Sequence, residues 1–385
     1  MPSDFTAVNH YVPQWYQQQF IPGTQLERKY HYLDLAPERV AKTSGGFYMR
    51  HELRRLGPAS CFEQEHLYTL RFGSHASDVI EKRFFGRIDD RGARAIEFFK
   101  HWEFNEQSHD MVHDLLAFLD AQKLRTPKGL DVLKTIAGSP DNQATLQAMR
   151  RLWQMHITIW MEGIWEVFEC EASPTKLIVT DHPVATYNKG SFPLSSPCKY
   201  PHDASIAALG THTLFPLGPD HLLVITNLGF VRNPWVNPIR QRENPRAFAD
   251  TMFDVRHIQT GRQLTEEQVI TANFILKSRA RRFIAAPERE WLYPERQMRT
   301  TMWNKLGDQF FPMPDPRKVA FSTQILVGYQ DGGAWGMDEY GRQDPEYDPK
   351  VKRLRDIEWD TFQKHKSLWD NKFGKLTRDE LLKYF

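Results

Sequence analysis

Segments with helical periodicity fill about residues 75–170 of this chain, and segments with the periodicity of β-strands lie on both sides of them. Apolar residues recur every three or four positions in DVIEKRFFGRIDDRGARAIEFFKHW and in DMVHDLLAFLDAQKLRTP, as on one face of a helix. Before this block ERKYHYLDL alternates aromatic and polar residues, and after it TKLIVTDHPVATY begins as a short apolar strand. We therefore predict an α+β fold with a mixed, partly antiparallel sheet and a large helical insertion.

The borders of the helical block carry more specific predictions. The block is expected to end with one long helix over ATLQAMRRLWQMHITIWMEGIWEVFEC, and HTLFPLGPDHLLVITN then predicts an antiparallel hairpin around its Gly-Pro-Asp turn. Near the N-terminus HYV predicts a short strand, followed by a helix with Pro13 in its first turn and Tyr16 and Phe20 on one face. A later amphipathic helix is predicted to begin with a capping box of Thr265 and Gln268.

The chain divides into an α+β domain over residues 1–294 and a C-terminal accessory segment over residues 295–385. The acidic, turn-rich YQDGGAWGMDEYGRQDPEYDP leaves the accessory segment with few apolar residues for a core of its own. We expect it to pack on the main domain through Trp359, Phe362 and Trp369. The alternative is a dimerisation arm, which leaves a homo-oligomer open.

The composition is that of a soluble, globular protein, with 41% hydrophobic, 25% charged and 13% aromatic residues. The net charge of +2 excludes a polyanion-binding field over the whole molecule, so a nucleic acid or nucleotide would have to bind a local basic patch. The cysteines Cys61, Cys170 and Cys198 lack metal-ligand spacing and are interpreted as reduced thiols of a cytoplasmic protein. No signal-peptide pattern and no run of about 18 apolar residues is present, so we expect no contact with a membrane.

Three residues are candidates for catalysis because local secondary structure does not fully account for them. His10 lies in the aromatic HYVPQWYQQQF, where a structural hydrogen bond is the ordinary alternative. Asp181 ends a strand directly before His182 and Pro183, which suits a catalytic or metal-binding carboxylate or, equally, an Asx-turn. Arg125 ends a helix, where its cation either complements the helix dipole or points inward as an anion clamp.

Further residues are candidates for substrate binding: Glu81, His182, Asn273, Lys277 and Arg281. The last three recur at i, i+4 and i+8, and this polar stripe is either a solvated helix face or, if it faces a cleft, a phosphate-binding surface. Glu81 falls in the first turn of a predicted helix, where a capping role is the alternative. A divalent metal ion is a candidate cofactor. No ligands are assigned to it, because the sequence contains no Cys–His metal set.

Two other motifs are set aside. Arg151 and His156 have the Arg-x4-His spacing of helical ribonucleases of the HEPN class, but this spacing arises easily by chance. His156 also precedes ITIW, which is typical of a buried segment. His109 and His113 are spaced for metal binding on one helix face, but no glutamate stands between them to supply the chemistry of an HExxH motif.

A set of segments occurs in a fixed order over about residues 9–290: NHYVPQWYQQQF, VIEKRFFGRID, LRTP, IVTDHPVATYN, FPLGPDHLLVI and TANFILKSRARRFIAA. The set resembles the bacterial family catalogued as domain of unknown function 4238, with its HYVPxxY, RTP and SDxPV signatures. His182 departs from the pattern, since the family usually has Asn there. The family label implies no established activity, so the resemblance leaves the function open.

Two hypotheses of function follow. The first is a nuclease-like hydrolase acting on a phosphodiester or nucleotide, with His10 and Asp181 as acid/base or metal-binding groups and Arg125 as the anion clamp. The second is a non-catalytic sensor or binding module in a bacterial stress or phage-defence setting. The enzyme hypothesis requires that the three side chains converge on one polar cleft.

Overall fold

The fold combines helices with antiparallel and mixed sheets, which confirms the predicted α+β class. The computed structural model of the chain describes residues 8–42, 46–65, 67, 70–72, 75–77, 85–139, 142–227, 255–307, 311–319, 324–338 and 349–382. Over these residues no helix combines the length and the apolarity that crossing a membrane requires.

A five-stranded sheet forms the centre of the molecule, with the strand order β11-β12-β13-β9-β14. Its strands are β9 (Ile164–Glu169), β11 (Ala185–Tyr187), β12 (His212–Pro216), β13 (His221–Thr226) and β14 (Gln259–Gln263). The β9–β14 pair is parallel and the other pairs are antiparallel. β12 and β13 pair from His212 opposite Thr226 to Pro216 opposite Leu222, so the predicted hairpin is confirmed.

A second, antiparallel sheet has the order β10-β15-β2-β5. Its strands are β2 (Tyr30–Asp34), β5 (Leu53–Leu56), β10 (Val179–Thr180) and β15 (Phe283–Ala286). Because β10 belongs to this sheet and β11 to the central one, the chain passes from one sheet to the other between Asp181 and Val184. The TDHPV segment is therefore buried between two sheets.

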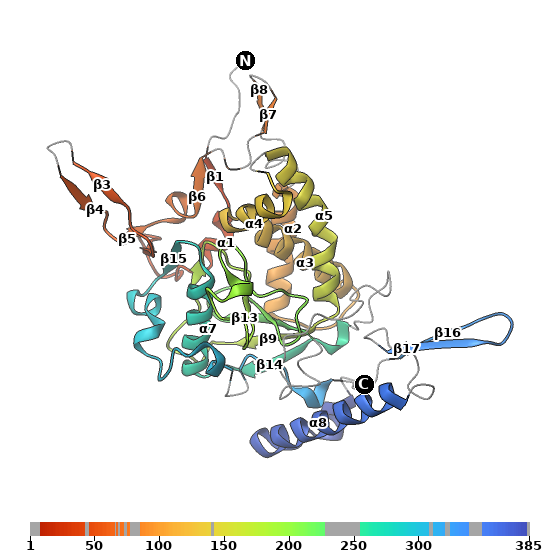
Figure 1. The fold of residues 1–385 in the computed structure, drawn as a ribbon. Coiled ribbons are helices and arrows are strands. Elements are labelled where there is room, and N and C mark those ends of the chain that lie inside the picture. The colour runs from red at the N-terminus through yellow and green to blue at the C-terminus, as the bar shows by residue number, and fades with distance from the viewer. Residues whose placement is uncertain are drawn as a thin grey trace.

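The helical block comprises α2 (Gly86–Lys100), α3 (Ser108–Arg125), α4 (Pro127–Ala137) and α5 (Asn142–Met161). Figure 1 shows α2, α3 and α5 along one side of the central sheet and α7 (Glu266–Arg279) on the other. Thr126 separates α3 from α4, and its hydroxyl accepts the N–H of Gly129 as the N-cap of α4. The predicted capping box of Thr265 and Gln268 is present at the start of α7.

The prediction of one helix through residue 170 is wrong. α5 ends at Met161, and IWEVFE forms β9, since its β-branched and aromatic residues suit a buried strand. Gly163 lies at the change of direction, where an added Cβ would come within 2.6 Å of the Ile225 side chain. Close packing against β13 therefore requires glycine at this position.

At the N-terminus, β1 (Val8–His10) leads into α1 (Gln14–Gln18). The strand ends at His10, two residues before the end of the predicted HYV strand, and Pro13 is the N-cap and not a first-turn residue. The Tyr16 and Phe20 rings pack edge to face with centroids 5.2 Å apart, as predicted. The Tyr16 hydroxyl donates to the carbonyl oxygen of Pro216 at 2.6 Å, which joins α1 to the central sheet.

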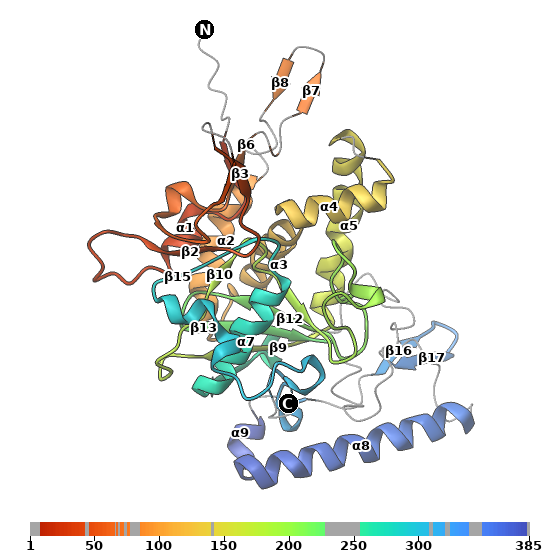
Figure 2. The same ribbon diagram turned by 60° about the vertical axis from the view of Figure 1, so that its left-hand side comes forward.

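Short two-stranded pairs surround this body: β1 with β6 (Glu63–Glu65), β3 (Arg39–Ala41) with β4 (Phe47–Met49), β7 (Leu70–Phe72) with β8 (His75–Ser77), and β16 (Gln324–Gly328) with β17 (Ala334–Asp338). The C-terminal segment ends in α8 (Pro349–Phe373) and α9 (Arg378–Leu382), and Figure 2 shows α8 beneath the body, far from α1 and α4. Phe362 packs with Ile164 and Val319, and Trp369 is buried, whereas Trp359 is 46% exposed. Two of the three predicted anchors thus contact the body.

Candidate active site

His10, the first predicted catalytic residue, lies at the end of β1. Its Nε2 atom is 3.3 Å from the carbonyl oxygen of Ala59 and 3.4 Å from Oε2 of Glu63. The Gln14 side chain donates to the same imidazole. These contacts tie the strand to neighbouring turns, which is the structural role considered for His10.

Arg125, the proposed anion clamp, is buried within the helical block. Its guanidinium donates to the side-chain oxygen of Gln122 and forms an ion pair with Asp89 at 2.8 Å. The rings of Phe85 and Phe118 lie 5.4 and 5.6 Å from its central carbon. Arg125 therefore joins α3 to α2 and does not reach Asp181.

Asp181 binds the chain that enters β15. Its carboxylate accepts the backbone N–H groups of Arg281, Arg282 and Phe283 at 2.8, 2.7 and 2.9 Å. Both oxygens are used by these donors, and the residue is buried. The expected cleft of His10, Arg125 and Asp181 does not form, because each side chain is held by a different set of partners.

The predicted polar stripe on α7 is likewise bound within the protein. The Asn273 amide donates to the carbonyl of Lys176 and accepts the N–H of Ile178, and Lys277 binds the carbonyl of Leu292. Lys277 also forms an ion pair, with Glu295 at 2.9 Å.

Arg281 donates to the Tyr200 hydroxyl and lies 3.5 Å from Asp131. α7 ends at Arg279, so Arg281 lies beyond the helix and the prediction of one helical stripe over the three residues is wrong. All three side chains bind groups within the protein, so they form neither a phosphate-binding surface nor a fully solvated one. Glu81 lies outside the described residues.

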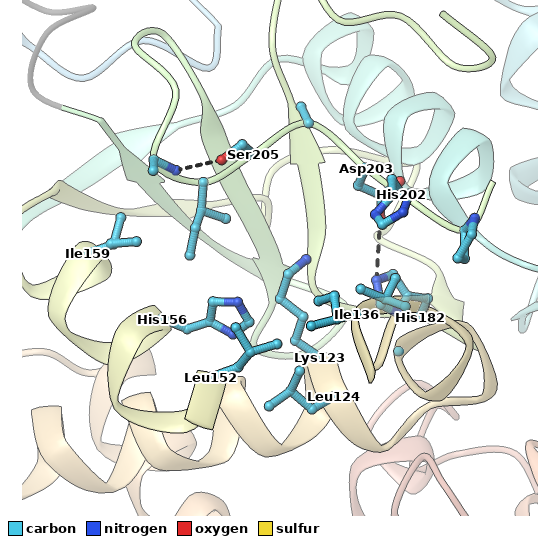
Figure 3. Close-up of a pocket in the computed structure, with 16 residues that line it drawn as sticks. Lys123, Leu124, Ile136, Leu152, His156, Ile159, His182, His202, Asp203 and Ser205 are labelled. Carbon is cyan, nitrogen blue, oxygen red and sulfur yellow. Dashed lines mark hydrogen bonds and ion pairs between the residues drawn. The ribbon is translucent and has the colours of Figure 1, made fainter. Parts of the chain in front are cut away.

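A cavity of about 490 Å³ lies between α3, α4, α5 and the loop of residues 201–207 that precedes β12. Figure 3 shows its walls. Apolar side chains supply most of the lining, and the polar groups are Lys123, His156, His182, His202, Asp203 and Ser205. Of the predicted site residues that the structure describes, His182 alone lines this cavity.

His156 and Asp120 form a hydrogen-bonded pair at one wall. Nδ1 of His156 is 2.7 Å from Oδ1 of Asp120, which is completely buried. Burial raises the pKa of Asp120 to about 6, and the hydrogen bond from His156 acts in the opposite direction. An ionised carboxylate can only accept, so Nδ1 of His156 is the donor of this hydrogen bond and Nε2 lies on the other side of the ring.

Lys123, one turn along α3 from Asp120, points its amine into the cavity (Figure 3). It forms no hydrogen bond or ion pair with any residue that the structure describes. Burial lowers the pKa of Lys123, and the positive charges of Lys128 and Arg279 lower it further. The negative charge of Asp203 raises this pKa and so offsets part of the effect. An anionic ligand in this cavity would give the Lys123 amine the hydrogen-bond acceptor that the described residues do not supply.

The opposite wall is organised around Asp203. Lys128 lies 2.7 Å from its carboxylate, and Arg279 and His182 lie 3.5 Å from it. Burial opposes the ionisation of Asp203, but Lys128 and His182 hold its pKa well below the usual range. Burial lowers the pKa of His182 to about 4, and its Nδ1 is 2.8 Å from the Thr126 hydroxyl, so this imidazole is neutral at pH 7.

The sequence carries a signal for two of these residues. Asp120 and Lys123 interrupt the apolar run of α3, and a charged residue on a buried helix face needs a partner or a function. His156 precedes the apolar ITIW, and only its contact with Asp120 identifies it as a functional candidate. Within the described residues, no group of three or more His, Cys, Asp or Glu side chains is placed to hold a metal ion.

Comparisons with known proteins do not assign the chain. No protein-family model matches it, and no match was found among curated proteins or solved structures. The resemblance to domain of unknown function 4238 therefore stays an expectation from the sequence.

Proposed function

We propose that the protein is a hydrolase of small phosphate esters, in the phosphodiester or nucleotide class, with the cavity between α3, α4 and α5 as its active site. One observation carries the proposal. The Asp120–His156 pair and the unpartnered amine of Lys123 open on the same cavity. A fixed base beside a cation is the combination that ester hydrolysis needs.

His156 would act as the general base. Asp120 holds Nδ1–H and stabilises the imidazolium that forms when Nε2 takes a proton from water. The hydroxide equivalent then attacks phosphorus. The pair is built into two helices, α3 and α5, so its orientation does not depend on a loop.

Lys123 would bind the phosphate. A phosphate oxygen beside its amine favours the ammonium form and offsets the lowered pKa. The volume of about 490 Å³ suits a ligand of metabolite size. The apolar walls, which include Leu124, Ile136 and Leu152, would contact the rest of the substrate.

The alternative is a non-catalytic sensor that binds the same class of ligand. Lys123 and the apolar walls serve binding and catalysis equally well. The Asp120–His156 pair favours an enzyme, because burying a carboxylate against an imidazole is costly and adds little to ligand binding.

Turnover of bis(4-nitrophenyl) phosphate by the full chain tests the proposal. His156→Asn should reduce the rate by about 10²–10⁴-fold, whereas His113→Asn, at an exposed position of α3, should not. Equal rates for wild type and His156→Asn would overturn it. Calorimetric binding of AMP that is lost in Lys123→Met, with no turnover of any ester, would instead support the sensor.

A further inference from the structure

Three imidazoles border the cavity, and they differ in their partners. His156 is held by Asp120, and His182 is held at Nδ1 by Thr126 with Nε2 facing Asp203. The His202 side chain forms no hydrogen bond or ion pair with the residues that the structure describes. Its ring nitrogens are therefore free to meet a ligand.

The backbone around His202 is nevertheless well anchored. Its N–H donates to the carbonyl of Lys199 at 2.9 Å, and the next residue, Asp203, is fixed by Lys128 and Arg279. The imidazole therefore stands on a tethered loop at the cavity wall. A group that has no partner but occupies a fixed position suits a role in the reaction.

We infer that His202 is the general acid of the hydrolysis proposed above, and that the natural substrate is a phosphodiester whose leaving group is an alcohol that must be protonated as it departs. Figure 3 places the Lys123 amine between His156 on one wall and His202 on the other. In-line displacement at phosphorus requires the attacking and leaving oxygens on opposite sides, with charge developing between them. His156, Lys123 and His202 line the same cavity and would supply the base, the cation and the acid of such a displacement.

The step balances without any further reactant. Water loses a proton to Nε2 of His156 and bonds to phosphorus. The bond from phosphorus to the leaving oxygen breaks, and the imidazolium of His202 gives its proton to that oxygen. His182 cannot replace His202, because it is buried, neutral and already bound to Thr126.

Leaving-group dependence tests this inference, which rests on the proposed function. Thymidine 5′-(4-nitrophenyl phosphate) releases a stable phenolate, whereas thymidylyl-(3′→5′)-thymidine must release a sugar alkoxide. His202→Asn and His202→Gln should slow cleavage of the dinucleotide by about 10²–10⁴-fold and leave the nitrophenyl ester nearly unaffected. Tyr200→Phe, a control two residues before His202 and outside the cavity lining, should change both rates alike.

An equal loss on both substrates in the His202 variants would overturn the inference. Wild-type turnover of the nitrophenyl ester without any cleavage of the dinucleotide would also overturn it and leave the proposed hydrolase intact. Absence of turnover with either ester would refute the proposed function itself. If both variants unfold, the wild-type rates over a series of aryl diesters test the inference instead. A shallow dependence of the rate on the acidity of the leaving group supports a general acid, and a steep dependence contradicts it.

Discussion

Nδ1 of His156 lies 2.7 Å from Oδ1 of Asp120, and the other carboxylate oxygen of Asp120 is buried without a hydrogen-bond partner among the described residues. A stability role alone explains this pair poorly, because desolvating a carboxylate costs free energy that one hydrogen bond does not offset. The pair fixes the tautomer and direction of an imidazole that faces the cavity.

Asp120→Asn should lower turnover by up to about 10⁴-fold, because the amide cannot stabilise the imidazolium of His156. The raised pKa of Asp120 means that the fold disfavours its charge at pH 7, so the melting temperature should stay the same or rise. Steady-state kinetics and thermal melts check both parts, with Asp110→Asn on the exposed face of α3 as control. A large fall in melting temperature with unchanged turnover per folded molecule would make Asp120 structural.

Asp181→Asn should destabilise the protein without removing activity from the molecules that stay folded. The carboxylate accepts three backbone N–H groups, and an amide would turn its NH₂ toward at least one of them. Burial raises the pKa of Asp181 despite these donors, so loss of the charge offsets part of the effect, and the unsatisfied N–H leaves an expected cost of about 1–3 kcal/mol. Asp131→Asn, a partly exposed control, should cost far less. An inactive but fully stable Asp181→Asn would restore Asp181 as a catalytic candidate.

Asn273→Asp should also destabilise the fold. The Asn273 amide donates to the carbonyl of Lys176 and accepts from Ile178 in a fully buried position. The variant keeps the acceptor but places a carboxylate oxygen against a carbonyl, at a cost of about 1–3 kcal/mol or more. Urea denaturation measures the change. Unaltered stability would show that this connection between α7 and the chain entering β10 is dispensable.

Buried histidines should make the protein sensitive to mild acid. Unfolded histidine titrates near pH 6.5, whereas burial lowers the pKa of His212 to about 3 and that of His182 to about 4. Below pH 6.5 the unfolded state binds protons that the folded state does not, so stability falls with pH by about 1.4 kcal/mol per unit for each histidine.

This loss continues until the folded pKa is reached. His212→Gln should decline less steeply than wild type in denaturation series from pH 7.5 to 4.5. Parallel curves would contradict the neutral, buried state of His212.

Phe362→Ala should cost about 3–5 kcal/mol if the C-terminal segment is an integral part of the fold, because Phe362 has no exposed surface and packs on Ile164. Trp359→Ala is the matched control on the same helix, and its half-exposed side chain should matter little. Limited proteolysis should release residues 349–382 from the Phe362 variant sooner than from wild type. Equal effects of the two changes would favour a weakly attached arm.

Local chemistry in the sequence was sufficient for several elements of the fold. The Gly-Pro-Asp turn predicted the β12–β13 hairpin, Thr265 and Gln268 predicted the start of α7, and Pro13 the start of α1. Each depends on contacts within a few residues, which periodicity and capping rules describe. The end of α5 was missed because an apolar run such as IWEVFE satisfies a buried helix and a buried strand equally.

The site depended on contacts between distant residues. His10, Arg125 and Asp181 are candidates because local secondary structure does not fully account for them, but each has a partner far away in the sequence. Ala59 is 49 residues from His10, Asp89 is 36 from Arg125, and the backbone after α7 is 100 or more from Asp181. Asp120 and His156 are also 36 residues apart, and neither is unusual until α3 and α5 pack together. Turns and helix caps, which depend on contacts within a few residues, were therefore determined by the sequence alone. Tertiary packing decided which charged side chains found a partner and which faced a cavity.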